Sequence, residues 1–137
     1  MRIVTLNANG IRSAASKGLF DWLPQQNADL LCVQETRAQP ADLQTSAVFA
    51  PDGWTVRLNS AQKKGYAGVA IYARNVPDAV LDSLGEPEFD DQGRYLEFRF
   101  GNLSVVSLYL PSGSSGPERQ AAKERCLECF EPLLRKW

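Results

Sequence analysis

Short apolar runs separated by polar loops form the pattern of this 137-residue chain. The run at 30–33 is apolar throughout and is bounded by polar residues, which is typical of a strand buried on both faces of a sheet. The run at 2–6 is rich in β-branched residues, and the same reasoning predicts a buried first strand there. Residues 13–26 place three large apolar side chains on one face, which predicts an amphipathic helix. The two strands of such a βαβ unit end at the same edge of a parallel sheet.

The remaining pattern predicts more strands and two further helices. A short helix is expected at 40–50, with Pro40 in its first turn. A long helix is expected at 118–137, with an apolar stripe made of Ala122, Cys126, Cys129, Phe130, Leu133 and Leu134. The predicted strands are 54–58, 68–73, 94–100 and 103–110, with a turn at 90–93 and a tight hairpin turn at Gly101–Asn102.

Composition limits the function classes. A hydrophobic content of 44% is that of one globular domain or part of one. Fifteen basic and sixteen acidic residues give a net charge of −1, so binding to nucleic acid would need a local basic patch. With no apolar run of membrane-spanning length and no secretory signal, we expect a cytoplasmic protein with no membrane partner.

The three cysteines are expected to be reduced thiols. Cys126 and Cys129 form a C-x-x-C pair, which raises the question of zinc. Because the chain has no histidine and only Cys32 remains, a four-ligand zinc site cannot be assembled from these residues. We interpret the pair as two helix residues.

Polar side chains follow both strands of the predicted βαβ unit. Glu35 comes just after the run at 30–33, and Asn7 comes just after the run at 2–6. A lone glutamate at a strand end is most often a solvated side chain. However, α/β folds place ligand and metal chemistry at this edge of the sheet, so the pair is a candidate site.

A second candidate is the connection at 59–67, which carries Lys63, Lys64, Gly65 and Tyr66. Two interpretations stay open for it. It is either an ordinary hairpin tip or a loop that sets cations against phosphate groups.

Five pieces of the chain, taken in order, resemble one family. They are LNANGIR at 6–12, QETR at 34–37, GYAGVAI at 65–71, Gly93–Arg94, and YLPSG at 109–113. Together they resemble the exonuclease III and abasic-site endonuclease family of the endonuclease/exonuclease/phosphatase superfamily. The resemblance implies a DNase I-like, four-layered α/β sandwich, of which residues 1–137 would be the N-terminal part of a single domain. We expect this part to supply roughly one mixed sheet with helices on one side.

The resemblance also implies an activity and roles for particular residues. Members hydrolyse DNA phosphodiesters with Mg²⁺, and Mn²⁺ is a possible substitute. They cut 5′ to abasic sites in double-stranded DNA, and many also remove nucleotides from 3′ ends. Glu35 resembles the family's metal-ligating glutamate, Asn7 the asparagine beside it, and Tyr109 the active-site tyrosine near the scissile phosphate. The expected DNA contacts are Arg37, Lys63, Lys64, Gly65, Tyr66, Arg94 and Ser112. Arg37 stands where the family often has lysine, and Ser112 where other members carry an amide.

Family members are about twice as long, and their second half supplies a Gly-Asp-x-Asn motif and an aspartate–histidine pair. This chain contains neither histidine nor that motif. One hypothesis is therefore the metal-binding half of a DNA-repair nuclease, active only beside its complementary half. The other is a catalytically inactive module that retains DNA or partner binding. For either, we expect self-association or a complementary C-terminal half to cover exposed apolar surface.

Overall fold

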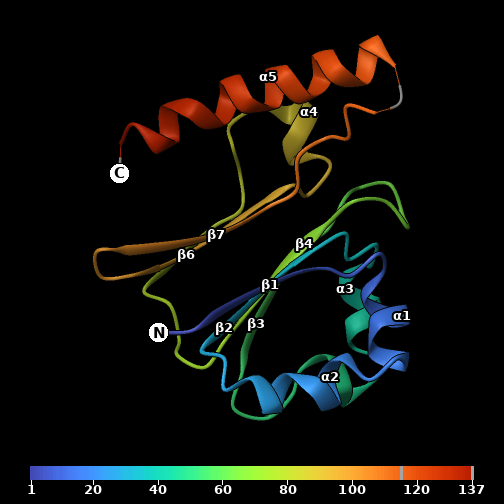
Figure 1. Cartoon of the computed structure of the whole chain (residues 1–137), viewed down its shortest axis with the longest axis vertical. Coiled ribbons are helices and arrows are strands. Elements are labelled where there is room, and N and C mark those ends of the chain that lie inside the picture. Colours follow the sequence, from blue (N-terminus) through green and yellow to red (C-terminus); the bar gives the residue numbers. More distant parts are fainter. Residues whose placement is uncertain (115, 137) are drawn as a thin grey trace.

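Seven strands pair into two sheets within residues 1–114 and 116–136, which the computed structural model describes (Figure 1). The first sheet has the order β1-β2-β4-β3; β1 and β2 are parallel, and the other neighbours are antiparallel. The second sheet has the order β5-β6-β7 and is antiparallel. The strands are β1 (Ile3–Asn7), β2 (Leu30–Gln34), β3 (Thr55–Asn59), β4 (Val69–Ala73), β5 (Ala79–Leu81), β6 (Tyr95–Phe100) and β7 (Leu103–Leu108).

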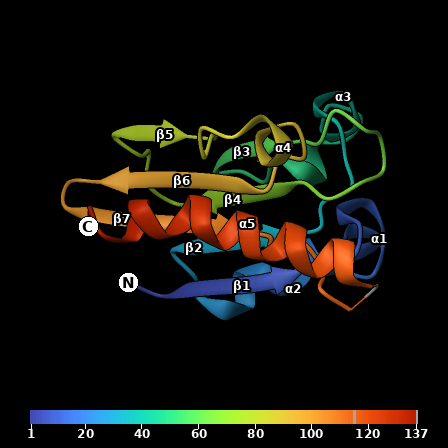
Figure 2. The ribbon, with the colours of Figure 1, turned by 90° about the horizontal axis from the view of Figure 1, so that it is seen from above.

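Helices cover the outer faces of both sheets, so the chain has four layers (Figure 1). The first sheet carries α1 (Ile11–Ser16), α2 (Leu19–Trp22) and α3 (Pro40–Leu43), with 3-10 turns at Leu23–Gln26 and Ala47–Phe49. The second sheet carries α4 (Pro87–Asp90) and α5 (Pro117–Leu134), and α5 runs along β6 and β7 (Figure 2). No helix in the described part of the chain is both long enough and apolar enough to cross a membrane.

The two central strands separate two hydrophobic cores. On β2, Leu31 and Val33 face the helices and pack with Ile11, Phe20 and Leu23. The alternate side chains of β2 and β4 face the second sheet. This inner core contains Leu30, Cys32, Val69, Ile71, Leu96, Phe98 and Val105. Burial on both faces confirms the interpretation of residues 30–33.

The expectation of one sheet with helices on one side is wrong. The chain forms two facing sheets because its last two strands, β6 and β7, pack their apolar row onto β2 and β4. The four-layered α/β class is therefore already present within this chain. Each sheet has two edge strands, β1 and β3 in the first sheet and β5 and β7 in the second. β1 and β7 are the lowest strands of their own sheets in Figure 2.

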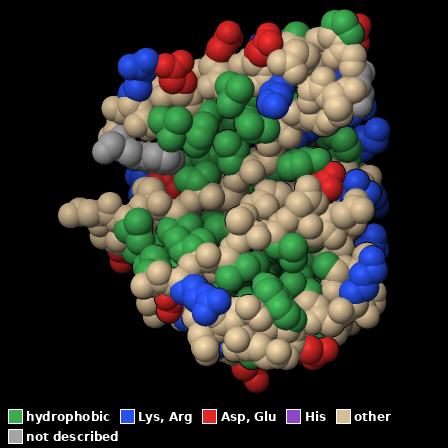
Figure 3. All heavy atoms as spheres, in the orientation of Figure 1, with side chains coloured by type: hydrophobic (Ala, Val, Ile, Leu, Met, Phe, Trp, Pro, Cys, Tyr) green, Lys and Arg blue, Asp and Glu red, His purple; other side chains and the backbone are tan. Residues whose placement is uncertain are grey.

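The strand predicted at 2–6 is present as β1, but the prediction that it is buried is wrong. Val4 and Leu6 pack on the helical core, but the alternate residue Ile3 is 48% exposed. The reason is that β1 is an edge strand, beyond the part of the first sheet that the second sheet covers (Figure 2). Figure 3 looks at this side of the molecule and shows hydrophobic side chains gathered over it.

Two helix predictions are wrong in length. The helix expected at 13–26 is interrupted at Gly18, whose φ of 89° is left-handed, and continues as α2 and a 3-10 turn. The helix expected at 40–50 ends at Leu43 and is followed by the turn at 47–49. Strand β5 and helix α4 were not predicted.

The long C-terminal helix is confirmed as α5, over Pro117–Leu134, and Trp137 lies outside the described residues. Of its predicted apolar stripe, Cys126 is buried, whereas Leu134 is 51% exposed and is not part of the packed face. All three cysteines are free thiols.

Candidate active site

The parallel pairing of β1 and β2 brings the two predicted ligands to one edge. Asn7 is paired with Gln34, so Glu35 follows directly beside it. The Gly10 N–H donates to the Glu35 carbonyl at 2.8 Å, which ties the loop after β1 to the loop after β2. The expectation that both residues end at the same sheet edge is confirmed.

Tyr109 reaches this edge from the other sheet. It follows β7, and its hydroxyl donates to Glu35 Oε1 at 2.5 Å. Arg37 Nη2 donates to the same oxygen at 3.2 Å. The side chain of Glu35 keeps 17% of its surface exposed. Glu35, Tyr109, Arg37 and Asn7 therefore come together where the two sheets meet.

Hydrogen bonding fixes the ionisation of this pair. The Tyr109 hydrogen bond has the largest effect on the pKa of Glu35 and lowers it; burial raises it by less, and Arg37 and Asn7 lower it further. Burial, followed by the bond to Glu35, raises the pKa of Tyr109 to about 12. At neutral pH Glu35 is therefore a carboxylate and Tyr109 a neutral phenol that donates a proton in a hydrogen bond.

The backbone after β2 is held in an unusual shape that directs Glu35 to the second sheet. Glu35 and Arg37 have left-handed φ angles of 53° and 49°. Such conformations are costly for residues other than glycine and persist where the surroundings enforce them. Here the Thr36 N–H donates to the Gly68 carbonyl at 3.0 Å and the Arg37 N–H to the Ala67 carbonyl at 2.9 Å. Gly68 is required at this point, because a Cβ there would overlap the Thr36 hydroxyl.

A polar row lies one residue behind the site and joins three strands. Gln34 Nε2 donates to Ser107 Oγ at 3.0 Å, and Thr5 Oγ1 donates to Gln34 Oε1 at 3.2 Å. Ser107 Oγ in turn donates to the Val33 carbonyl at 3.1 Å. This row fixes β7 against β2, and thus the distance over which Tyr109 reaches Glu35.

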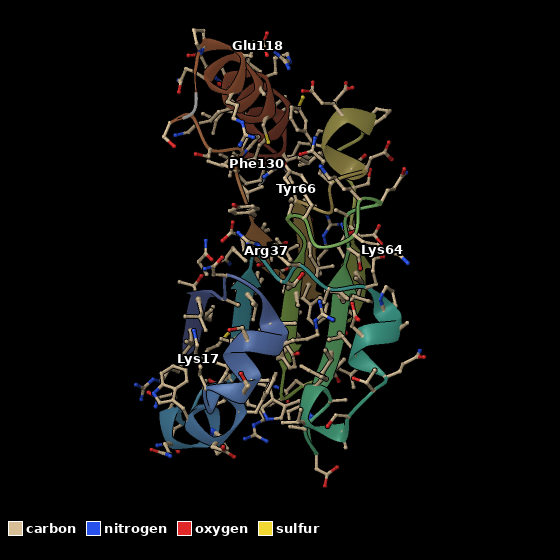
Figure 4. All side chains as sticks on the ribbon, turned by 90° about the vertical axis from the view of Figure 1, so that its right-hand side faces the viewer. Lys17, Arg37, Lys64, Tyr66, Glu118 and Phe130 are labelled. Atoms are coloured by element: carbon tan, nitrogen blue, oxygen red, sulfur yellow. The ribbon has the colours of Figure 1, made fainter. Side chains whose placement is uncertain are left out.

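The predicted cationic loop lies on the rim of this end of the sandwich (Figure 4). Lys63 and Lys64 are exposed, and the Lys63 ammonium stands 5.7 Å from the centre of the Tyr66 ring. Lys64, Gly65 and Arg37 line one hollow together with Arg12.

Arg12 was not among the predicted contacts. In the sequence, Arg12 is the last residue of the LNANGIR piece at 6–12, two positions after the loop that follows β1. In the structure it lines the hollow beside Arg37 and pairs with Asp42 at 3.3 Å.

Two predicted DNA contacts have their side chains engaged within the protein. Arg94 is only 3% exposed, and its donors are turned inward to Gln92, Tyr109 and Tyr66, so its contact with DNA stays a prediction. Ser112 is exposed, but its hydroxyl is bonded to the Ser114 hydroxyl at 2.7 Å. It lines a separate hollow with Tyr66, Arg94 and Arg119.

The donor set suits a hard divalent cation. A carboxylate and an amide, both bearing oxygen, meet at a partly open edge, and Mg²⁺ is often bound by one or two protein ligands while it keeps several waters. No group of three or more His, Cys, Asp or Glu side chains placed to hold a metal occurs in residues 1–114 and 116–136. These residues therefore suit a metal ion that takes few of its ligands from this chain.

Comparisons with known proteins identify relatives of this chain. Residues 4–135 match the Endonuclease/Exonuclease/phosphatase family. The chain is 33% identical over 120 residues to an exodeoxyribonuclease of Bacillus subtilis (strain 168), covering 87% of this chain and 46% of the relative. It is 32% identical over 120 residues to the DNA repair nuclease APEX1 of Danio rerio, covering 85% of this chain and 38% of the relative.

Solved structures agree in shape as well. The AP endonuclease from Archaeoglobus fulgidus matches with a TM-score of 0.84 and 30% identity, over 99% of this chain and 52% of that one. A 3′-5′ exonuclease (NExo) from Neisseria meningitidis matches with a TM-score of 0.84 and 25% identity, over 99% and 52% of the two chains. The chain thus spans about half of these structures, and less than half of the two curated relatives.

Proposed function

Because the chain belongs to the endonuclease/exonuclease/phosphatase family, we propose that it is the Glu35-bearing part of a DNA-repair nuclease of the exonuclease III type. Its reaction is Mg²⁺-dependent phosphodiester hydrolysis in double-stranded DNA, 5′ to abasic sites, at 3′ ends, or both. The observation that carries the proposal is the contact between Tyr109 and Glu35, which joins a phenol of one sheet to a carboxylate of the other.

Each residue of the cluster has a role in this proposal. Glu35 and Asn7 would hold Mg²⁺, or Mn²⁺ in its place, and the bound metal would supply Lewis-acid chemistry to the phosphate and its leaving oxygen. Tyr109, neutral at working pH, would release Glu35 when the carboxylate binds the metal and would then donate its one hydroxyl proton in a hydrogen bond to a phosphate oxygen. Arg37 would add a cation that attracts the same phosphate.

The DNA runs over the cationic rim, where Lys63, Lys64, Gly65 and Tyr66 touch the backbone of the duplex rather than base edges. Replacing both lysines with alanine should lower the affinity for every sequence alike. The slope of log K against log salt should flatten by up to ~2 units, because each phosphate contact releases about one counterion. Fluorescence anisotropy with a duplex that carries one abasic site measures this slope.

The matched control replaces Arg2 and Lys136 with alanine. Both are exposed and lie near the chain termini, at the end of the molecule opposite the cationic rim (Figure 1). This variant should keep the wild-type slope. An unchanged slope in the Lys63/Lys64 variant, or a loss confined to one DNA sequence, would contradict the proposed track.

The complete enzyme covers the open edges β1 and β7 with the rest of the parent polypeptide. Two observations support this: the exposed apolar residues Ile3 and Leu103 on the edge strands, and the 46% of the B. subtilis relative that this chain spans. Unpaired strand edges are templates for further strands. Residues 1–137 alone should therefore self-associate at micromolar concentration and cleave an abasic duplex poorly.

Light scattering with and without Ile3→Lys tests this, since a charge on the edge strand opposes pairing. The control is Val48→Lys, which changes a residue that is 40% exposed in the 3-10 turn on the helical face. A wild-type chain that is a stable monomer and cleaves the duplex at ordinary enzymatic rates would contradict this part of the proposal.

A further inference from the structure

Arg94 is a buried cation that pairs with no carboxylate. It is 3% exposed, and within the described residues it takes part in no ion pair. A buried charge is retained only where hydrogen bonds satisfy it. Its three bonds are Nε to Gln92 Oε1 at 2.8 Å, Nη1 to the Tyr109 carbonyl at 2.9 Å, and Nη2 to the Tyr66 hydroxyl at 3.0 Å.

Two of these bonds lead to tyrosines of the candidate site. The guanidinium lies 5.1 Å from the centre of the Tyr109 ring and 5.7 Å from that of Tyr66, within the range of a cation–π contact. In addition, the Tyr109 N–H donates to the Arg94 carbonyl at 2.9 Å. The main chain of Tyr109 is thus held at both its N–H and its C=O by one residue, just beyond the last pair of the β6–β7 ladder.

The backbone before Arg94 is equally constrained. Gly93 has a φ of 57°, and a Cβ there would lie 2.5–2.8 Å from backbone atoms of Asn59 and Ser60. A side chain at this position would push Arg94 away from the loop that carries Tyr66. The placement of the guanidinium between the two rings therefore depends on this close approach.

We infer that Arg94 is a positioning residue, which aims the Tyr109 hydroxyl at Glu35 and holds the Tyr66 ring on the rim, without touching DNA itself. The purpose of this positioning rests on the proposed function, whereas the hydrogen bonds and ring contacts of Arg94 do not depend on it. A planar guanidinium is needed at this position, because the three hydrogen bonds leave in different directions from Nε, Nη1 and Nη2. A lysine, with one ammonium, cannot replace it.

Fluorine NMR tests the inference directly. The chain has four tyrosines, so 3-fluorotyrosine gives four signals, each assigned by a Tyr→Phe replacement. Arg94→Gln and Arg94→Lys should both shift and broaden the signal of Tyr109. The matched control, Arg99→Gln, removes an arginine that bonds Glu97 next to Tyr95, so it should move the Tyr95 signal and leave Tyr109 unchanged.

The salt dependence of binding to the abasic duplex separates positioning from contact. Arg94→Gln should keep the wild-type slope, whereas Arg37→Gln, which removes a half-exposed cation, should flatten it by about 1 unit. A Tyr109 signal that stays in place in Arg94→Gln, or a loss of slope equal to that of Arg37→Gln, would overturn the inference. If Arg94→Gln does not fold, Tyr66→Phe removes one partner of the guanidinium and should still shift Tyr109. If no variant binds DNA, the proposed function fails and the fluorine signals alone decide the role of Arg94.

Discussion

Two glutamates of this chain have almost the same partners and different surroundings. Glu35 accepts from the hydroxyl of Tyr109 at 2.5 Å and from Arg37 at 3.2 Å. Glu97 accepts from the hydroxyl of Tyr95 at 2.5 Å and from Arg99 at 2.6 Å. Each is a carboxylate between a phenol and a guanidinium.

The difference lies in where the donors fall. At Glu97 three residues donate to the two oxygens, since Ser104 also donates to Oε1 at 2.7 Å, and only 2% of the side chain is exposed. It lies mid-strand in β6, in the row that faces α5. At Glu35 tyrosine and arginine both meet Oε1, 17% of the side chain is exposed, and the residue ends a strand beside Asn7. A carboxylate saturated inside a packed layer can only support the fold, whereas one at an open edge can exchange partners.

Glu97→Gln should have the largest effect on stability. The substitution keeps the shape but places an amide donor among three donors, so at least one buried group loses its partner. Such a loss typically costs 1–3 kcal/mol, and we expect the free energy of unfolding to fall by roughly 2 kcal/mol at pH 7. Urea denaturation measures it, with the exposed Glu124→Gln as the control. A change below about 0.5 kcal/mol would mean that the buried hydrogen bonds of Glu97 contribute little to stability.

The same cluster should make the chain sensitive to acid. Burial raises the pKa of Glu97, but the bonds from Arg99, Tyr95 and Ser104 together outweigh it, and the pKa lies below its ordinary value of 4.5. A lowered folded-state pKa means that the unfolded chain binds the proton first, so the contribution is present at neutral pH and is lost as the pH falls below 4.5.

Between pH 6 and pH 3 the melting temperature of the wild type should therefore fall further than that of Glu97→Gln. Part of the decline should persist in the variant, because the pKa values of Glu35 and Glu88 are also lowered, each mainly by a hydrogen bond from Tyr109 or Arg125. Parallel declines in the two proteins would show that Glu97 carries no acid-linked stability.

The contrast between the two glutamates also shows what the sequence can and cannot reveal. Glu35 was predictable because it ends an apolar run, and strand ends are where α/β folds place ligands. Glu97 was not, because Tyr95, Glu97 and Arg99 alternate with apolar residues, a pattern that normally marks a solvated face. Only the packing of α5 onto that row buries it.

Errors in the fold have the same origin. Central strands β2 and β4 are buried on both faces, and their apolar sequences indicate this burial. β1 has a similar composition, yet it is an edge strand, and a strand's place in a sheet is decided by residues far away in the chain. Arg94 was expected to bind DNA because its motif resembles the family. Its burial between two tyrosines could not be predicted, because it depends on three separate segments that meet in the fold. Each of these properties is non-local.

The most direct test is whether Glu35 binds a divalent metal. Mn²⁺ can be titrated into residues 1–137 and its free signal followed by electron paramagnetic resonance. Glu35→Gln should weaken binding by at least ~10-fold, since even outer-shell partners of metal ligands are worth about that much. The matched control is Glu88→Gln, which changes a surface carboxylate bonded to Arg125 and should leave the affinity as it is. Glu35→Gln should also lower the free energy of unfolding by less than Glu97→Gln does, because 17% of the Glu35 side chain is exposed and only 2% of the Glu97 side chain. Equal Mn²⁺ affinity in the wild type and in a folded Glu35→Gln variant would remove Glu35 from the metal site and contradict the proposed function.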